Sequence, residues 1–167
     1  MKYFGTTIFL TSMIIFSFSI ESCTKNTNEA AAVTASPKDT WTIIQDNILT
    51  PTCATSGCHS STSDANYVQH NLLLTSATAY DNLINTTSKN AAAKTAGLVR
   101  VKPGDHISSL LYQKIDCQTT AQYGSLMPLG KANLTLGQIE FIKQWIHKGA
   151  PKKGSVVDET ILANNAV

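Results

Sequence analysis

The sequence is poor in charge and in aromatic side chains. Charged residues make up 14% of the 167 residues, aromatic residues make up 7%, and the formal net charge is only +2. A charge this small and this evenly spread argues against the dense basic surface of nucleic-acid-binding proteins, and against a polybasic patch that holds a chain on a membrane. The length and the hydrophobic fraction of 43% suit one small domain with tails.

The sequence also lacks the common catalytic patterns. It contains no Ser/His/Asp order of the hydrolase kind, no glycine-rich phosphate loop and no pair of carboxylates at a suggestive spacing. Hydrolase and nucleotide-binding functions therefore have no support, and we expect that the protein is not an enzyme by itself.

Long apolar runs are equally scarce, and the one that occurs, over residues 8–20, lies at the start of the chain. It has the length of a signal-peptide core and is too short and too rich in serine to span a bilayer. The run ends in Ile-Glu-Ser before Cys23, which resembles the lipobox of bacterial lipoproteins. We therefore expect a signal peptide over 1–22 and lipidation of Cys23; the alternative is an ordinary signal peptide followed by a chance cysteine. The lipid would be the sole membrane anchor, placing the protein in the cell envelope, periplasmic or on the outer surface.

The rest of the chain divides by composition. Residues 24–38 are rich in Thr, Asn, Ala and Ser without apolar periodicity, so we expect a lipidated flexible tether over 23–38. Segments with helical spacing of apolar residues begin at about Asp39 and recur along the chain, which predicts a folded domain over 39–153. The weakly patterned residues 154–167 are expected to form a peripheral tail.

Apolar residues at helical spacing predict an all-α domain of about four short helices with long loops and no strand set. The first helix should begin at Asp39 or Thr40, run for about ten residues and stop before Pro51. The clearest helix is predicted over 135–148, where Thr135 provides the cap.

Two more short helices are expected between these, one from Thr78 and one after the Pro103-Gly104-Asp105 turn. Residues 52–75 and 116–133 are predicted to be loops, and residues 89–97 fit no element.

Four cysteines occur, and two of them lie in the segment Cys53-Ala-Thr-Ser-Gly-Cys58-His59. In c-type cytochromes two thiols add to the haem vinyl groups and the following histidine binds the iron, usually in a C-x-x-C-H signature. Here the spacer is four residues long; it can bulge away while both sulfurs reach the vinyls, and Gly57 would relax the backbone. A disulfide between Cys53 and Cys58 stays open as the alternative, whereas a zinc site lacks a further ligand pair.

Met127 is the only methionine outside the leader, and it precedes Pro128 in a glycine-bearing loop. A thioether on such a loop suits the second axial position of a haem iron, and His/Met ligation raises the reduction potential as electron transfer requires. A methionine that fills a gap in the core is the alternative.

The remaining candidates have weaker support. His70 and His106 are possible iron ligands in place of Met127, although histidines in polar loops are usually solvated. His147 lies off the apolar stripe of the last helix and is expected to be exposed. Asp105 is expected to cap a helix rather than to act as an acid catalyst.

The order of these features resembles cytochrome c domain proteins of planctomycete and Bacteroidota type, over residues from about 41 to 151. The matching pieces are Ile48-Leu49-Thr50-Pro51, Cys53, Cys58-His59, Val101-Lys102-Pro103-Gly104-Asp105, Ser108-Ser109-Leu110-Leu111, Met127-Pro128 and Trp145-Ile146-His147-Lys148-Gly149-Ala150.

This resemblance implies a cytochrome c-like fold around one covalent haem c. It implies thioethers at Cys53 and Cys58, with His59 and Met127 as the axial iron ligands, and helices over 41–49 and 135–148 that cross. The expected function is one-electron transfer to redox partner proteins of the cell envelope, with no nucleic-acid partner.

Two other functions stay open. One is a haem-free binding lipoprotein in which Cys53 forms a disulfide with Cys58 or Cys117. The other is a peroxidase-like enzyme whose haem iron keeps an open position. Cys117 has no evident role if Cys53 and Cys58 both bind haem, and it would pair with Cys53 if Cys58 alone does so.

Overall fold

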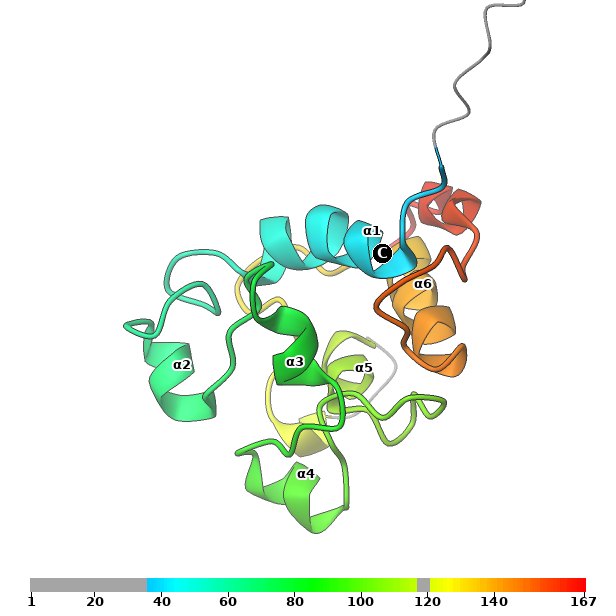
Figure 1. Ribbon diagram of the computed structural model, residues 1–167. Coiled ribbons are helices and arrows are strands. Elements are labelled where there is room, and N and C mark those ends of the chain that lie inside the picture. Colours follow the sequence, from blue (N-terminus) through cyan, green and yellow to red (C-terminus); the bar gives the residue numbers. More distant parts are fainter. Residues whose placement is uncertain (1–35, 117–120) are drawn as a thin grey trace, which may run out of the picture. The chain divides into compact units, whose positions relative to one another are not determined.

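The computed structural model describes residues 36–116 and 121–167, whose helices are drawn in Figure 1. The expected signal peptide, the lipidation site Cys23 and the cysteine at position 117 lie outside the described residues. The described chain is mostly helical, which confirms the all-α class, although it contains six α-helices rather than about four. No helix in these ranges combines the length and the apolar character needed to cross a membrane.

The first helix does not stop before Pro51 as predicted. It begins as α1 (Thr40–Ile44) and continues as the π-helical segment η1 (Gln45–Cys53), with Pro51 inside it. Proline breaks an α-helix because its ring clashes with the carbonyl four residues earlier, whereas the wider π turn moves that carbonyl aside. The Thr52 hydroxyl donates a hydrogen bond to the Ile48 carbonyl, which satisfies a group of the disturbed turn. The continuation carries the helix to Cys53.

Two helices in the middle of the chain were not predicted. α2 (Ala65–His70) lies within the expected loop 52–75, and α4 (Ala91–Thr95) lies within the unassigned residues 89–97. None of the residues of α2 is buried and only Ala93 of α4 is, so neither helix carries an apolar stripe that periodicity could detect.

The other two predicted helices of the middle region are present as α3 (Ala79–Leu83) and α5 (Leu110–Ile115). Isolated β-bridges join the segments that flank them, such as Ile84 with Val101 and Val99 with Ser109. These bridges form no sheet within the described residues.

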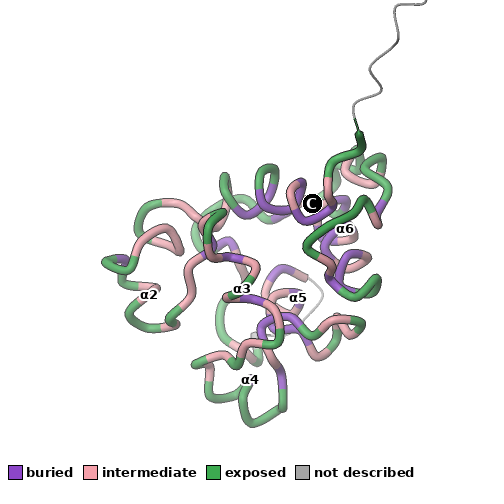
Figure 2. The backbone as a smooth tube through the Cα atoms, viewed as in Figure 1, coloured by how far each residue is buried: buried purple, intermediate pink, exposed green. Residues whose placement is uncertain are grey.

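The last helix, α6 (Leu136–His147), confirms the prediction and its cap. The Thr135 hydroxyl accepts from the Gln138 N–H at 3.2 Å, while the Gln138 side chain accepts from the Thr135 N–H at 3.0 Å. Trp145 of this helix is fully buried, and its ring lies 5.3 Å from that of Trp41 in α1. Figure 2 shows buried residues along α1 and α6, so these two helices share the core.

Residues 154–167, expected to form a peripheral tail, are mostly exposed but make defined contacts with α6. They form η3 (Glu159–Ala163), which packs against α6. The N–H groups of Leu136 and Gly137 donate to the carbonyls of Ala166 (2.7 Å) and Asn164 (3.0 Å), which pairs two groups that a helix start leaves open. A Cβ at Gly137 would collide with the Ile161 carbonyl, so this glycine permits the close approach.

The polar side chains expected to cap α1 instead form hydrogen bonds with the chain that follows α6. Asp39 occupies the cap position, yet its carboxylate accepts from the Gly154 N–H at 2.6 Å and pairs with Lys153 at 3.1 Å. The buried Thr40 hydroxyl accepts from the N–H groups of Val156 and Val157. Residues 153–157 thus fix the start of α1 through these polar contacts.

Candidate functional site

One cavity brings together the side chains that the sequence singled out. Its volume is about 430 Å³, within the usual range for cofactor sites. Cys53, Cys58 and His59 line it from the end of η1 and the following turn, and Met127 lines it from the segment before α6. Residues of α2, α3, α5 and η2 (Ala121–Tyr123) contribute to the lining; Figure 1 shows these elements surrounding one region of the domain.

The expanded spacer between the cysteines forms a turn that returns to the helix end. The Cys58 N–H donates to the Thr55 carbonyl at 3.0 Å, and the His59 N–H donates to the Cys53 carbonyl at 3.2 Å. Gly57 has φ of +79°, so the glycine provides the backbone freedom that the longer spacer was expected to need. Both cysteines therefore line one cavity despite the unusual spacing.

The thiols of Cys53 and Cys58 are both free, and neither takes part in a disulfide. Burial raises the pKa of the half-buried Cys53 thiol, although the hydrogen bond with Thr52 works in the opposite direction. The Thr52 hydroxyl lies 3.2 Å from the Cys53 sulfur. Cys53 is thus a neutral thiol at physiological pH.

His59 is oriented by a single backbone contact. Its Nδ1 lies 3.0 Å from the Leu72 carbonyl oxygen, and because a carbonyl can only accept, Nδ1 carries the proton. Burial lowers the pKa of His59, which favours the neutral ring with a free lone pair on Nε2. Histidines that bind metals commonly have their other ring nitrogen held in this way.

Asp64 shapes the turn that carries Cys58 and His59, and sequence reasoning missed it. Its carboxylate accepts from the N–H groups of Gly57 (3.0 Å), Ser60 (3.0 Å) and Ser61 (2.8 Å), and also from the Ser60 hydroxyl. Burial works to raise the pKa of Asp64, but these hydrogen bonds outweigh it and lower the pKa. The anionic side chain thereby fixes the turn.

Met127 is held in the cavity wall by the end of α5. Its N–H donates to the Lys114 carbonyl at 2.7 Å, and its peptide bond to Pro128 is cis. The Lys114 ammonium donates to the carbonyls of Tyr123 (3.0 Å) and Ser125 (2.6 Å), which ties the preceding segment to the same helix.

Lys131 connects this wall to the opposite one. Its ammonium donates to the Thr55 hydroxyl at 2.7 Å and to the Thr52 carbonyl at 3.3 Å, both within two residues of Cys53. The segment with Met127 and the segment with the two cysteines are therefore joined by a direct contact.

The cavity lining is cationic and apolar. It includes Arg100, Lys114 and Lys131 together with several leucines, and it contains no carboxylate among the described residues. Arg100, the only arginine of the chain, is buried and donates to the carbonyls of Asn82, His70 and Asn71 at 2.8 to 3.0 Å. No ion pair with a carboxylate neutralises it within the described part of the chain. Sequence reasoning missed this residue, although its being the sole arginine was a signal.

The other candidate histidines separate into two groups. His70 lines the cavity, which is a requirement for an iron ligand that would replace Met127. Burial lowers the pKa of His70. His106 and His147 do not line it. Asp105 accepts a hydrogen bond from the Ser108 N–H, so it closes a turn before α5 rather than capping the helix, whose cap position is Ser109.

Comparisons with family models, with curated proteins and with solved structures gave no match. Within residues 36–116 and 121–167, no group of three or more His, Cys, Asp or Glu side chains is arranged to hold a bare metal ion. The function must therefore be argued from the cavity itself.

Proposed function

We propose that the protein is an exported monohaem c-type cytochrome that transfers single electrons and is anchored to a bacterial membrane by a lipid on Cys23. The observation that carries the proposal is the cavity in which Cys53, Cys58, His59 and Met127 meet. Two thiols, one imidazole and one thioether are the groups that hold haem c in cytochromes with His/Met ligation.

Each group has a separate role in this proposal. Cys53 and Cys58 would hold the haem by thioether bonds, formed as each S–H adds across a vinyl double bond of the porphyrin. His59 would bind the iron through Nε2, and Met127 would bind it through its sulfur. When bound, the haem supplies one-electron exchange between ferrous and ferric iron.

The chain itself would orient the histidine and exclude water. The Leu72 carbonyl keeps the proton on Nδ1 of His59, which leaves Nε2 as the donor atom and increases its basicity. Leu74, Leu83 and Leu110 are buried residues of the lining, and an apolar wall of this kind limits the access of water and so affects the reduction potential.

The charge of the cavity also suits haem, whose two propionates are anionic. The buried guanidinium of Arg100 carries a positive charge without a carboxylate partner in the described residues, and the lining offers no negative charge to repel a propionate. An anionic occupant would therefore relieve an electrostatic cost that the empty protein bears.

Covalent attachment is tested by a haem stain after denaturing electrophoresis, with the protein exported from cells that contain a cytochrome c maturation system. We expect a stained band for the unaltered protein, a weaker one for Cys53→Ser or Cys58→Ser, and none for the double variant. Ser56→Ala, in the exposed part of the spacer, is the matched control and should stain fully. An unstained wild-type band would overturn the proposal and favour the haem-free binding lipoprotein.

The lipid anchor has its own test, because Cys23 lies outside the described residues. Cys23→Ala should move the mature protein from the membrane fraction to the soluble envelope fraction, where it would still meet redox partner proteins. Continued sedimentation with membranes after salt washing would contradict the anchor.

A further inference from the structure

Two histidines that do not line the cavity meet on the surface of the domain. His106 lies in the turn before α5, and His147 is the last residue of α6. Nδ1 of His106 and Nε2 of His147 are hydrogen-bonded, and their ring centroids lie 4.4 Å apart with 38° between the planes. His147 is exposed and His106 is partly exposed. The two residues are 41 positions apart, and no sequence pattern predicts their contact.

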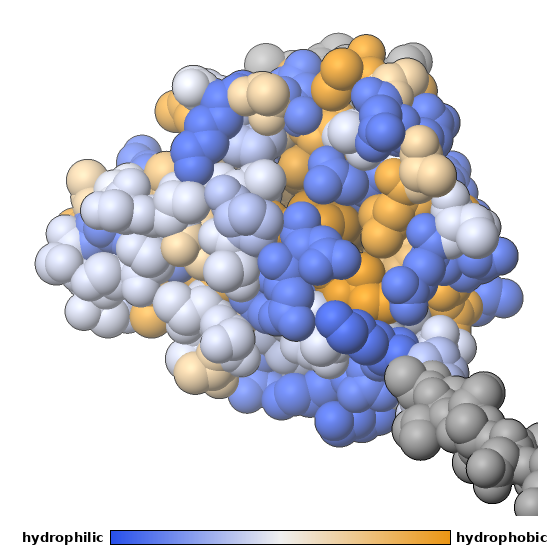
Figure 3. Space-filling model, turned by 90° about the horizontal axis from the view of Figure 1, so that it is seen from above, coloured by the Kyte–Doolittle hydropathy of each residue, from blue (hydrophilic) through white to orange (hydrophobic). Residues whose placement is uncertain are grey.

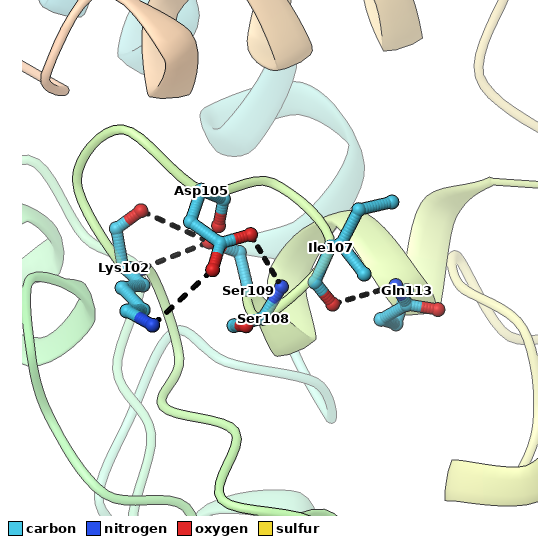
Figure 4. A network of polar contacts seen from close by, with 6 residues as sticks. All are labelled: Lys102, Asp105, Ile107, Ser108, Ser109 and Gln113. Atoms are coloured by element: carbon cyan, nitrogen blue, oxygen red, sulfur yellow. Dashed lines mark hydrogen bonds and ion pairs between the residues drawn. The ribbon is translucent and has the colours of Figure 1, made fainter.

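The backbone that carries His106 is fixed by the network of polar contacts in Figure 4. One carboxylate oxygen of Asp105 accepts from the Ser108 N–H at 3.0 Å, and the other pairs with the Lys102 ammonium at 3.2 Å. The Ser109 hydroxyl donates to the Asp105 carbonyl at 2.7 Å. His106 therefore projects from a closed turn rather than from a loose loop.

This turn is also tied to the end of α6. The Gly104 N–H donates to the Ile146 carbonyl at 2.8 Å, next to His147 in the chain. The ring of Tyr112 meets the ring of His106 edge to face, with centroids 4.7 Å apart. Both the position of the pair and the tilt of the His106 ring are thus set by the fold, which is the condition for a preorganised binding site.

The surroundings of His106 lower its pKa and so favour the neutral ring. Burial lowers the pKa of His106, the neighbouring His147 and Lys143 lower it further, and Asp105 and Glu140 act in the opposite direction. Glu140 forms an ion pair with Lys143 at 3.1 Å, which offsets part of the positive charge on this face of α6. Neutral imidazole is the form that binds metal ions.

We propose that His106 and His147 together bind one divalent transition-metal ion of the class that prefers imidazole, with Cu²⁺ bound more tightly than Zn²⁺. The two facing nitrogens are the ligands, and water fills the other positions. When the ion binds, the ring that carries the proton of this hydrogen bond transfers it to its other nitrogen, the one facing away from the ion. Two neutral rings can therefore bind the ion without releasing a proton to solvent. With bonds of about 2.0–2.1 Å, the two nitrogens must move apart to roughly 3 Å, which the exposed His147 ring allows.

The site is independent of the haem proposal, because neither histidine lines the cavity. It is an open site with two protein ligands, consistent with the lack of any three-residue metal cluster among the described residues. Its affinity should fall as the pH drops, because a protonated imidazole does not bind metal ions.

The test is a calorimetric titration of the mature protein, as it is purified after export, with CuCl₂ and separately with ZnCl₂, repeated on His106→Asn and His147→Asn. We expect one Cu²⁺ site whose affinity falls by more than about tenfold in each variant and by no more in the double variant, because a single ion needs both rings. Electron spin resonance of the bound Cu²⁺ should show coupling to two nitrogens in the unaltered protein and fewer in each variant.

Lys148→Gln, one residue beyond His147, is the matched control and should bind Cu²⁺ as the unaltered protein does. Equal Cu²⁺ affinity in the unaltered protein and in the double histidine variant would overturn the proposal, as would a spectrum without coupling to two nitrogens. Circular dichroism of each variant should be unchanged, since both substitutions lie at exposed or partly exposed positions. The haem stain does not enter this test, so the two proposals fail separately.

Discussion

The two halves of the domain differ in how completely they are packed. Around α1 and α6, the side chains of Ile44, Phe141, Ile142 and Trp145 are all 0% exposed. Around the cavity, the thiols, His59, Leu72 and Met127 are only half-buried. Figure 2 shows this contrast, with buried residues along α1 and α6 and mainly exposed or intermediate ones along α2 and α4.

The surface also differs between the two sides of the domain. In Figure 3 weakly polar residues cover the side that bears α2, whereas the opposite side mixes hydrophobic with strongly hydrophilic residues. The region around α1 and α6 is filled by its own side chains, whereas the other region surrounds a cavity of about 430 Å³ that apolar and cationic groups line. The difference teaches that α1 and α6 supply much of the buried core, whereas a molecule that binds the cavity only in the folded protein would add to its stability.

The largest effect is expected in the cavity region, at the proposed proximal iron ligand His59. His59→Ala should abolish stable haem incorporation, because the iron loses its proximal nitrogen and the cysteine-histidine unit is no longer complete. The ratio of haem absorbance to protein absorbance after purification measures it. His70→Ala alters another histidine of the same cavity and should keep its haem; a full haem content in the His59 variant would show that the proximal assignment is wrong.

In the packed region the corresponding change is Trp145→Ala. The substitution removes a fully buried ring and its 3.0 Å hydrogen bond to the Pro151 carbonyl, so the free energy of unfolding should fall by about 3–5 kcal/mol. Urea denaturation followed by far-ultraviolet circular dichroism gives the value, with the exposed Lys148→Ala as control. A loss below about 1 kcal/mol would mean that this region is not the stable part of the molecule.

A smaller, functional effect is expected at Met127. Met127→Ala should leave the haem attached but lower its reduction potential and remove the weak ferric absorption band that iron–sulfur ligation produces. Asn133→Ala changes an exposed residue of the same segment that does not line the cavity, and it should alter neither property. If the Met127 variant keeps both the band and the potential, His70 becomes the next candidate for the second axial position.

The smallest effect is expected on the pH dependence of stability, through the carboxylate of Asp64. Because its pKa is lowered in the folded protein from the ordinary value of 3.8, its contribution to stability is full above that pH and is lost as the pH falls below it. Asp64→Asn should therefore reduce stability at neutral pH and flatten the decline that the unaltered protein shows below about pH 4. Thermal melts between pH 3 and 7 test this, with the exposed Asp46→Asn as control; parallel curves for the unaltered protein and the Asp64 variant would refute the role of its charge.

The packed region was also the easier one to predict from the sequence. The Thr135 cap and the apolar stripe of α6 are local features, and the structure confirms both. The π-helical course through Pro51 was not predictable, because proline ordinarily ends a helix. The docking of residues 154–167 on α6 was not predictable either, because it depends on contacts between distant segments. Helix propensity and periodicity carry no information about such contacts.

In the cavity region, sequence and structure contributed different parts. The cysteine–histidine segment and Met127 were identifiable as chemistry-bearing residues, and Gly57 as the residue that relaxes the spacer. Asp64 and Arg100 were missed, since their roles arise from backbone groups that only the folded chain brings to them. The ligands of a site are thus easier to recognise in a sequence than the residues that position them.

The central claim is that both Cys53 and Cys58 carry one haem, and peptide mass spectrometry of the alkylated mature protein tests it most directly. The account predicts a single peptide in which both cysteines bear the mass of one haem, with Cys117 as the one thiol of the domain that reacts with the alkylating reagent. A Cys53–Cys58 peptide without the haem mass, joined by a disulfide or alkylated at both sulfurs, would contradict it.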